Sequence, residues 1–216
     1  MKIALSRPWL TAELERPMRV LSWALNRPGF VMAERIVWRE VRNADLPEDL
    51  DAGLWFQQEL ERTGYGEAIG FLTSRNIEHF TKARVTREGV SVEVLATVGL
   101  SNAVRIGGEI APVQVAAGTI NIAVTVSCGL SEAAQIEALS IATEARTAAV
   151  IAHGPDLADG RATGTGTDCI AIAAPPGKMT HAGLHTPVGQ AIGAAVLDAV
   201  SRGVQDWIKE RTERGT

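Results

Sequence analysis

The residues best suited to chemistry lie in one stretch after position 160. Threonine alternates with glycine from Thr163 to Thr167, and the run ends on the carboxylate of Asp168. His185 follows, directly before Thr186 and Pro187. Threonine followed by proline favours the start of a helix, because the hydroxyl accepts a free N–H group and proline lacks one. The stretch therefore combines a carboxylate, an imidazole and a helix amino end of the kind that attracts anions.

Those groups suit the hydrolysis of an amide. The reaction needs an activated nucleophile, donors for the developing oxyanion and an acid for the departing amine. His185 could act as the base and then as the acid, since an unperturbed histidine has a pKa of about 6.5. Asp168 could hold that imidazole in the correct tautomer or accept a proton from water. The competing interpretations are structural. Asp168 could close its turn by accepting N–H groups, and His185 could pack against the helix start.

Neighbouring residues are candidates for binding the substrate. Threonine hydroxyls can donate to substrate amides, or act as nucleophiles when a base is adjacent. Glycines let the backbone approach a ligand closely, and N–H groups at a helix start would stabilise an oxyanion. The pattern A-T-x-x-x-[ST]-[ND] occurs at 96–102 and again at 162–168, which predicts two walls of one site. The predicted binding residues are Thr163, Gly164, Thr165, Gly166, Thr167, Ser101, Asn102 and Thr186.

Other reactive side chains favour structural roles. Cys169 begins an apolar run, where a thiol is usually inert. Glu144 is expected to pair with Arg146 or with solvent. The sequence has no H-E-x-x-H motif, no Cys/His zinc pattern, no complete dinucleotide fingerprint and no P-loop. We therefore predict no catalytic metal and no cofactor, although the four-residue spacing of His181 and His185 leaves metal binding open.

Composition narrows the class of protein. The chain has 216 residues, of which 46% are hydrophobic, and this favours a single domain over 1–216 with a full core. A net charge of −4, without any basic run, argues against a nucleic-acid partner. The two cysteines suit a reducing cytoplasm. Neither a secretory leader nor a membrane span is expected. Self-association into a homo-oligomer stays open.

The elements that must position these residues follow from hydrophobic periodicity and from capping signals. Asn26 to Gly29 is a turn signal between two apolar runs, which predicts a hairpin. The order of elements favours an α+β fold with a mixed, largely antiparallel sheet and long helices packed on one face. We expect strands at 18–25, 30–41, 68–73, 80–87, 90–98, 118–126 and 169–174, and helices at 45–62, 131–152 and 187–211.

Four pieces of the chain resemble the adenosylcobinamide amidohydrolase family. They are A-T-V-G-L-S-N-A-V-R-I-G from Ala96, G-T-I-N-I from Gly118, T-G-T-G-T-D-C-I-A-I-A from Thr163 and H-A-G-L-H-T-P-V-G-Q-A-I-G-A-A-V from His181. They occur in the expected order, and the resemblance is clearest from about Leu95 onward. It implies a hydrolase that removes the aminopropanol arm of adenosylcobinamide to give adenosylcobyric acid during cobalamin salvage.

The resemblance also implies a small-molecule corrinoid as the partner. Water activated by His185 with the help of Asp168 would attack the amide. Trp23, Trp38 and Phe30 could support the flat corrin ring, although core packing is favoured for any one of them. One histidine could instead contact the corrinoid cobalt. Two alternatives stay open: a corrinoid-binding protein without hydrolytic activity, and a hydrolase with a threonine nucleophile that cuts its own chain between 163 and 167.

Overall fold

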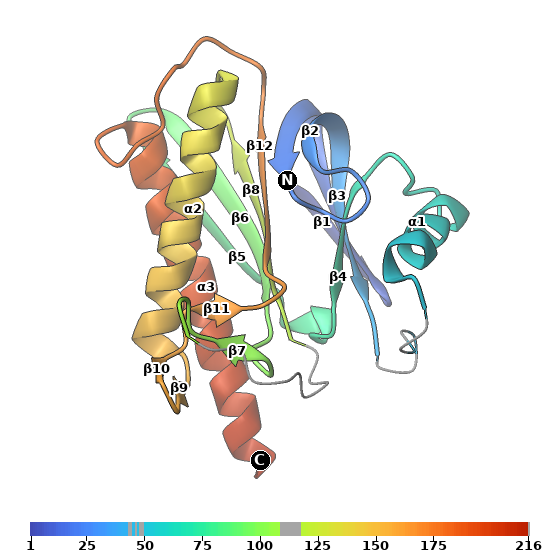
Figure 1. Ribbon diagram of the computed structural model, residues 1–216. Helices are drawn as coiled ribbons and strands as arrows, with labels where there is room; N and C mark the ends of the chain where they lie inside the picture. Colours follow the sequence, from blue (N-terminus) through green and yellow to red (C-terminus); the bar gives the residue numbers. More distant parts are fainter. Residues whose placement is uncertain (43–44, 46, 48–49, 109–117, 216) are drawn as a thin grey trace.

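A computed structural model describes residues 1–42, 45, 47, 50–108 and 118–215 (Figure 1). Its strands and helices, in chain order, are β1 Lys2–Ser6, β2 Trp9–Ser22, β3 Gly29–Glu40, α1 Ala52–Arg62, β4 Ile69–Thr73, the 3-10 helix η2 Ile77–His79, β5 Thr81–Arg87, β6 Val90–Val98, β7 Ala103–Val104, β8 Ile120–Val126, α2 Glu132–His153, β9 Asp156–Leu157, β10 Gly160–Arg161, β11 Gly164–Thr165, β12 Cys169–Ala174 and α3 Pro187–Glu213.

One eight-stranded sheet dominates the described part of the chain. Its order is β4-β3-β2-β12-β8-β6-β5, with β1 paired to β2. Five of its seven pairings are antiparallel, and the β12–β8 and β3–β4 pairings are parallel. The predicted α+β class with a mixed, largely antiparallel sheet is therefore confirmed.

The central strands are buried on both faces. Every residue of β8 and β12 is buried, as expected for strands covered on both sides. Ile120, Ile122 and Ile170 point into the core that α2 and α3 cover, whereas Ala123 and Ala171 belong to a second core shared with β2 and β3. Figure 1 shows the resulting layers: α2 and α3 lie on one side of the central strands, and β1 to β4 lie on the other.

The long helices pack on one face, as predicted. Ser131 caps α2 by accepting from the N–H of Ala134, and Thr186 caps α3 by accepting from the N–H of Gly189. A Cβ added to Gly203 of α3 would lie 2.6 Å from Val98 Cγ2, so the helix approaches β6 closely because that position has no side chain. The shorter α1 packs separately, against Trp9 and Val37 of the amino-terminal strands.

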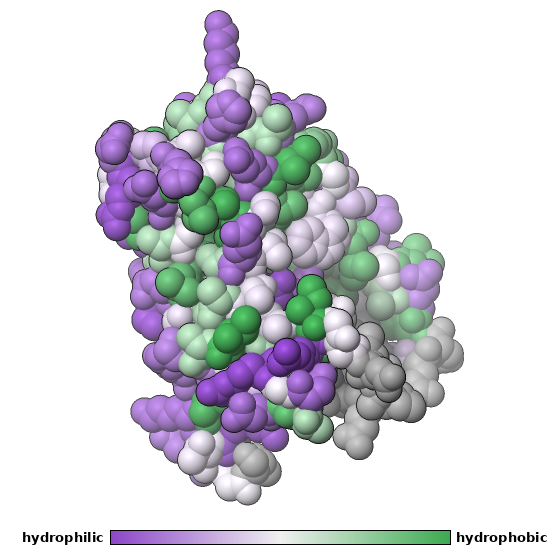
Figure 2. All heavy atoms as spheres, turned by 60° about the vertical axis from the view of Figure 1, so that its left-hand side comes forward, coloured by the Kyte–Doolittle hydropathy of each residue, from purple (hydrophilic) through white to green (hydrophobic). Residues whose placement is uncertain are grey.

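The outer face of α2 and α3 is mixed in character. Ile136, Ile151 and Leu197 are exposed on these helices. Figure 2 shows this side of the molecule, where hydrophobic and hydrophilic residues are interspersed. Exposed apolar side chains distributed in this way are normal for a protein surface. Neither α2 nor α3, nor the described α1, is both long enough and apolar enough to cross a bilayer.

Several predicted boundaries hold and others shift. The hairpin at Asn26–Gly29 is confirmed, since β2 and β3 pair antiparallel on either side of it. The strand at 90–98 and the strand at 169–174 match β6 and β12 residue for residue. The first helix begins later than expected, at Ala52, because Asp51 caps it by accepting from the N–H of Leu54. Positions 46, 48 and 49 of the expected start lie outside the described residues.

Candidate active site

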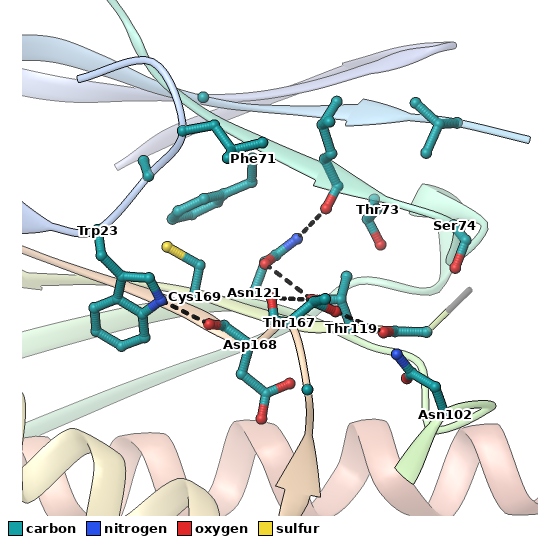
Figure 3. A pocket seen from close by; sticks show the side chains of 17 residues that line it. Trp23, Phe71, Thr73, Ser74, Asn102, Thr119, Asn121, Thr167, Asp168 and Cys169 are labelled. Atoms are coloured by element: carbon teal, nitrogen blue, oxygen red, sulfur yellow. Dashed lines mark hydrogen bonds between the residues drawn. The ribbon is translucent and has the colours of Figure 1, made fainter. Parts of the chain in front are cut away.

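A cavity of about 450 Å³ lies where β4 meets the amino ends of β8 and β12. This volume falls within the usual range for ligand pockets. Figure 3 shows Trp23 and Phe71 at one end of the cavity and Ser74 and Asn102 at the other. The lining residues are Trp23, Ala24, Leu25, Val41, Gly70, Phe71, Leu72, Thr73, Ser74, Asn102, Gly118, Thr119, Asn121, Gly166, Thr167, Asp168 and Cys169.

The Asp168 carboxylate is engaged by the protein itself. It accepts from Thr165 N at 3.0 Å, from Ile120 N at 2.9 Å and from the Thr165 hydroxyl, and it forms an ion pair with Arg146. In Figure 3 the Asp168 side chain leaves the cavity and points toward the helices, while its backbone oxygen accepts from Trp23 Nε1 at 2.8 Å. This geometry matches the turn-closing interpretation of Asp168 and leaves its carboxylate without a path to a substrate in the cavity.

No pattern in the sequence points to Arg146 as the partner of Asp168. This arginine lies on α2, donates to the Thr163 carbonyl at 3.3 Å, and forms the ion pair with Asp168 from a side chain that is 14% exposed. Of the two structural roles expected for Glu144, the structure shows the solvent-facing one: Glu144 is exposed and accepts from the hydroxyl of Ser140, and Arg146 pairs with Asp168 instead. The ion pair also explains Gly164, since a Cβ there would lie 2.6 Å from Asp168 Oδ2.

The threonines of the turn face different partners. The Thr163 hydroxyl accepts from Ile106 N at 2.8 Å, and the Thr165 hydroxyl donates to Asp168, so both serve the turn. Thr167 is different because it lines the cavity with Gly166, and its hydroxyl donates to the Gly118 carbonyl at 2.9 Å. The turn therefore presents one threonine to the cavity.

The two copies of the repeated pattern do meet. β7 follows the first copy and β11 lies within the second, and they pair antiparallel, with Ala103 opposite Thr165. Asn102 and Thr167 consequently line the same cavity. Ser101, by contrast, lies in a separate shallow hollow beside Trp207, so the structure separates it from Asn102.

A network of polar groups continues the wall that the turn begins, because β8 lies beside β12. Asn121 is 2% exposed and donates to the Leu72 carbonyl at 2.7 Å, which ties β8 to β4 across the cavity. The Thr119 hydroxyl donates to the Thr167 carbonyl at 2.8 Å and lies 3.4 Å from Asn121 Oδ1. Both residues belong to the G-T-I-N-I piece of the family resemblance, and the sequence alone predicts no role for their side chains.

His185 and Thr186 lie at the other end of the sheet from Asp168. Asp168 directly precedes β12 and His185 follows it, and six strand residues span about 20 Å. Near His185, the Ala182 N–H donates to Glu137, which precedes Arg146 on α2 by nine residues or about 14 Å. Figure 1 shows the loop before α3 and the turn at β11 at opposite ends of the helices.

The structure therefore does not bring His185 and Asp168 together as the predicted pair. His185 is exposed, as is His181, and the Thr186 hydroxyl is used to cap α3. The helix start at Thr186 cannot supply N–H donors to the cavity. The separation has a physical cause: an extended strand lies between residues that are only 17 positions apart in sequence.

Burial also settles the state of Cys169. It lines the cavity at 8% exposure, and desolvation raises the pKa of its thiol to about 12. The thiol thus stays protonated at neutral pH, in agreement with the prediction that it is not a nucleophile. Of the proposed aromatic platform, Trp23 lines the cavity at 46% exposure, whereas Trp38 is fully buried in the core and Phe30 does not line the cavity. Within the described residues, no group of three His, Cys, Asp or Glu side chains has the arrangement of a metal site.

Comparison with known proteins points to one family. The model of a family described as adenosylcobinamide amidohydrolase matches residues 1–212. An adenosylcobinamide amidohydrolase from Halobacterium salinarum is 35% identical over 142 residues, which cover 62% of this chain and 57% of that protein. A solved structure, the PH0078 protein from Pyrococcus horikoshii OT3, aligns over 90% of this chain and 76% of its own at 11% identity, with a TM-score of 0.43.

Proposed function

The chain belongs to the adenosylcobinamide amidohydrolase family, and we propose that it hydrolyses the amide joining aminopropanol to the corrin ring of adenosylcobinamide. The products would be aminopropanol and adenosylcobyric acid, and the reaction would serve cobalamin salvage. The observation that carries this proposal is the family match over residues 1–212. Three of the four resembling pieces also contribute residues to one cavity.

The size of the cavity determines which part of the substrate enters. A volume of about 450 Å³ suits a small polar arm and an amide, and is far too small for a whole adenosylated corrinoid. The aminopropanol arm would therefore enter, with the ring outside. Trp23 and Leu25 are 46% and 62% exposed at the cavity, and their apolar surface would contact the ring.

The polar lining complements an amide with a neighbouring alcohol. The hydroxyls of Ser74 and Thr167 and the side-chain amide of Asn102 supply donors and acceptors at the end of the cavity away from Trp23 (Figure 3). Fixed donors of this kind stabilise the charge that develops on a carbonyl oxygen under attack. Asp168 and Arg146 would act indirectly, by holding the turn that carries Thr167.

Incubation of the purified chain with adenosylcobinamide tests the proposal. We expect release of aminopropanol and a corrinoid product whose mass matches adenosylcobyric acid. Heat-denatured chain serves as the control. A change in the corrinoid absorption spectrum without any product would support the binding-protein alternative and refute the hydrolase. No spectral change and no product would refute both.

A further inference from the structure

The peptide bond between Gly118 and Thr119 lies in an unusual setting at the wall of the cavity. Thr119 directly precedes β8 and is 6% exposed, and both residues line the cavity. The Gly118 carbonyl accepts from the Thr167 hydroxyl at 2.9 Å. A Cβ on Gly118 would lie 2.6 Å from Asn102 Oδ1 and 2.8 Å from Ser101 N, so only glycine fits. The carbonyl thus accepts from a fixed donor, as a reacting carbonyl does in an oxyanion site, and the residue that carries it is closely packed on its Cα side.

The Thr119 hydroxyl is held in place beside that carbonyl. It donates to the Thr167 carbonyl at 2.8 Å, and the next residue, Ile120, donates its N–H to Asp168 at 2.9 Å. Asp168 is in turn fixed by Arg146. The ion pair therefore positions the amino end of β8, and with it Thr119, relative to the turn at 163–168.

For repeated attack on substrate amides, a threonine hydroxyl needs a base that takes up its proton. The titratable side chains among the described lining residues are Asp168 and Cys169. Asp168 is engaged with Arg146, and the thiol stays protonated because burial raises its pKa to about 12. Among the described residues, the base that remains for a threonine in this position is its own α-amino group. That group is free only if the bond to the preceding residue has been cut.

We infer that the chain cleaves its own Gly118–Thr119 bond and that Thr119 is the nucleophile of the hydrolysis. Thr119 Oγ1 attacks the Gly118 carbonyl carbon, the C–N bond breaks, and the hydroxyl proton passes to the Thr119 nitrogen, which leaves an ester. Water then hydrolyses the ester. The products are a carboxylate on Gly118 and a Thr119 with a free α-amino group. The Thr167 hydroxyl stabilises the charge on the Gly118 oxygen.

The second reaction rests on the proposed function. The α-amino group of Thr119 accepts the hydroxyl proton as Oγ1 attacks the substrate amide, and it returns the proton to the departing aminopropanol nitrogen. Water, activated by the same amine, hydrolyses the ester and releases the corrinoid acid. Asn102 Oδ1 is buried and has no hydrogen-bond partner within the described residues, and the new amine would add a donor close to it.

The proposed cleavage site differs from the one that the sequence suggests. The sequence placed a candidate cut between 163 and 167, but the Thr163 hydroxyl is bonded to Ile106 N and to the Val104 carbonyl, and the Thr165 hydroxyl is bonded to Asp168. Thr167 donates to the carbonyl of another residue instead of its own neighbour. The hydroxyl that adjoins an enclosed, polarised peptide bond is that of Thr119.

Mass spectrometry of the full chain under denaturing conditions tests the cleavage. We expect two polypeptides, 1–118 and 119–216, with threonine at the new amino terminus. Thr119→Ala should give one full-length chain and should lower aminopropanol release by about 10²–10⁴-fold. Thr119→Ser keeps a hydroxyl and should keep both cleavage and hydrolysis. Thr167→Val should slow cleavage by about 10²-fold, because it removes one oxyanion donor.

Thr125→Ala is the matched control. Thr125 lies on β8, the strand that Thr119 precedes, is 7% exposed and does not line the cavity, so its loss should leave cleavage and hydrolysis intact. A single full-length mass for the wild-type chain would overturn the inference whatever its activity. So would a Thr119→Ala chain that keeps more than about a tenth of the rate. Cleavage at Thr119 without release of aminopropanol would support self-cleavage and sink only the corrinoid assignment.

Discussion

Replacing Asp168 with asparagine should destabilise the fold before it affects chemistry. The carboxylate side chain is 6% exposed and faces Arg146, which is 14% exposed. Removing one partner of a buried ion pair costs about 3–5 kcal/mol, since the other charge is left buried and unpaired. Asparagine also brings two N–H donors to a position where Thr165 N and Ile120 N already donate. At about 2–4 °C per kcal/mol for a chain of this size, a loss of about 3 kcal/mol lowers Tm by about 6–12 °C.

Urea denaturation followed by circular dichroism measures this change. Glu144→Gln is the matched control, because Glu144 lies on the same helix as Arg146, is exposed and accepts from the Ser140 hydroxyl. We expect it to change the free energy of unfolding by less than about 0.5 kcal/mol. An Asp168→Asn chain with unchanged stability but abolished hydrolysis would refute the structural role of Asp168 and restore it as a catalytic carboxylate.

Three further outcomes follow from the geometry. His185→Ala should release aminopropanol within about twofold of the wild-type rate, because the imidazole is exposed at the far end of β12; a loss of 10²-fold or more would contradict the placement of the site. Trp23→Ala should raise KM more than it lowers kcat, since the indole would contact the corrin ring equally in the ground and transition states. A larger change in kcat than in KM, measured by steady-state kinetics, would exclude a binding role. Burial raises the pKa of the Cys169 thiol from 9.0 to about 12, so the folded protein favours the protonated thiol. The stability that the protonated thiol contributes is therefore complete below about pH 9 and is lost as pH rises toward 12. Denaturation of wild type and Cys169→Ala across this range should converge as pH rises, and parallel curves would disprove the shift.

Local signals explain why much of the architecture was predictable. Ser131 and Thr186 cap their helices through their own side chains. The alternation of valine with other residues at the start of β6 predicts a strand with one buried face, as the structure shows. Such features depend on a few neighbouring residues. The start of α1 was misplaced because the acidic run at 45–49 and Asp51 give the same capping signal, and only packing selects between them.

The site was predictable only in part, because its contacts join distant segments. Asn102 and Thr167 meet as the repeated pattern indicated, through the pairing of β7 with β11. Arg146 is 22 residues from Asp168, and nothing local distinguishes it from other arginines. The separation of His185 from Asp168 depends on the path of the loop between Ala174 and His185, which the strand predicted before that loop does not determine.

The hydrogen bond from the Trp23 indole to the Asp168 carbonyl gives the molecule an optical reporter. Of the five tryptophans, all within the described residues, Trp23 is the one that lines the cavity. A coloured macrocycle bound against it would quench tryptophan emission by energy transfer, and Trp23 would be the nearest donor. Occupancy of the unlabelled protein can thus be followed by fluorescence, and Trp23→Phe measures the share of the signal that comes from this indole.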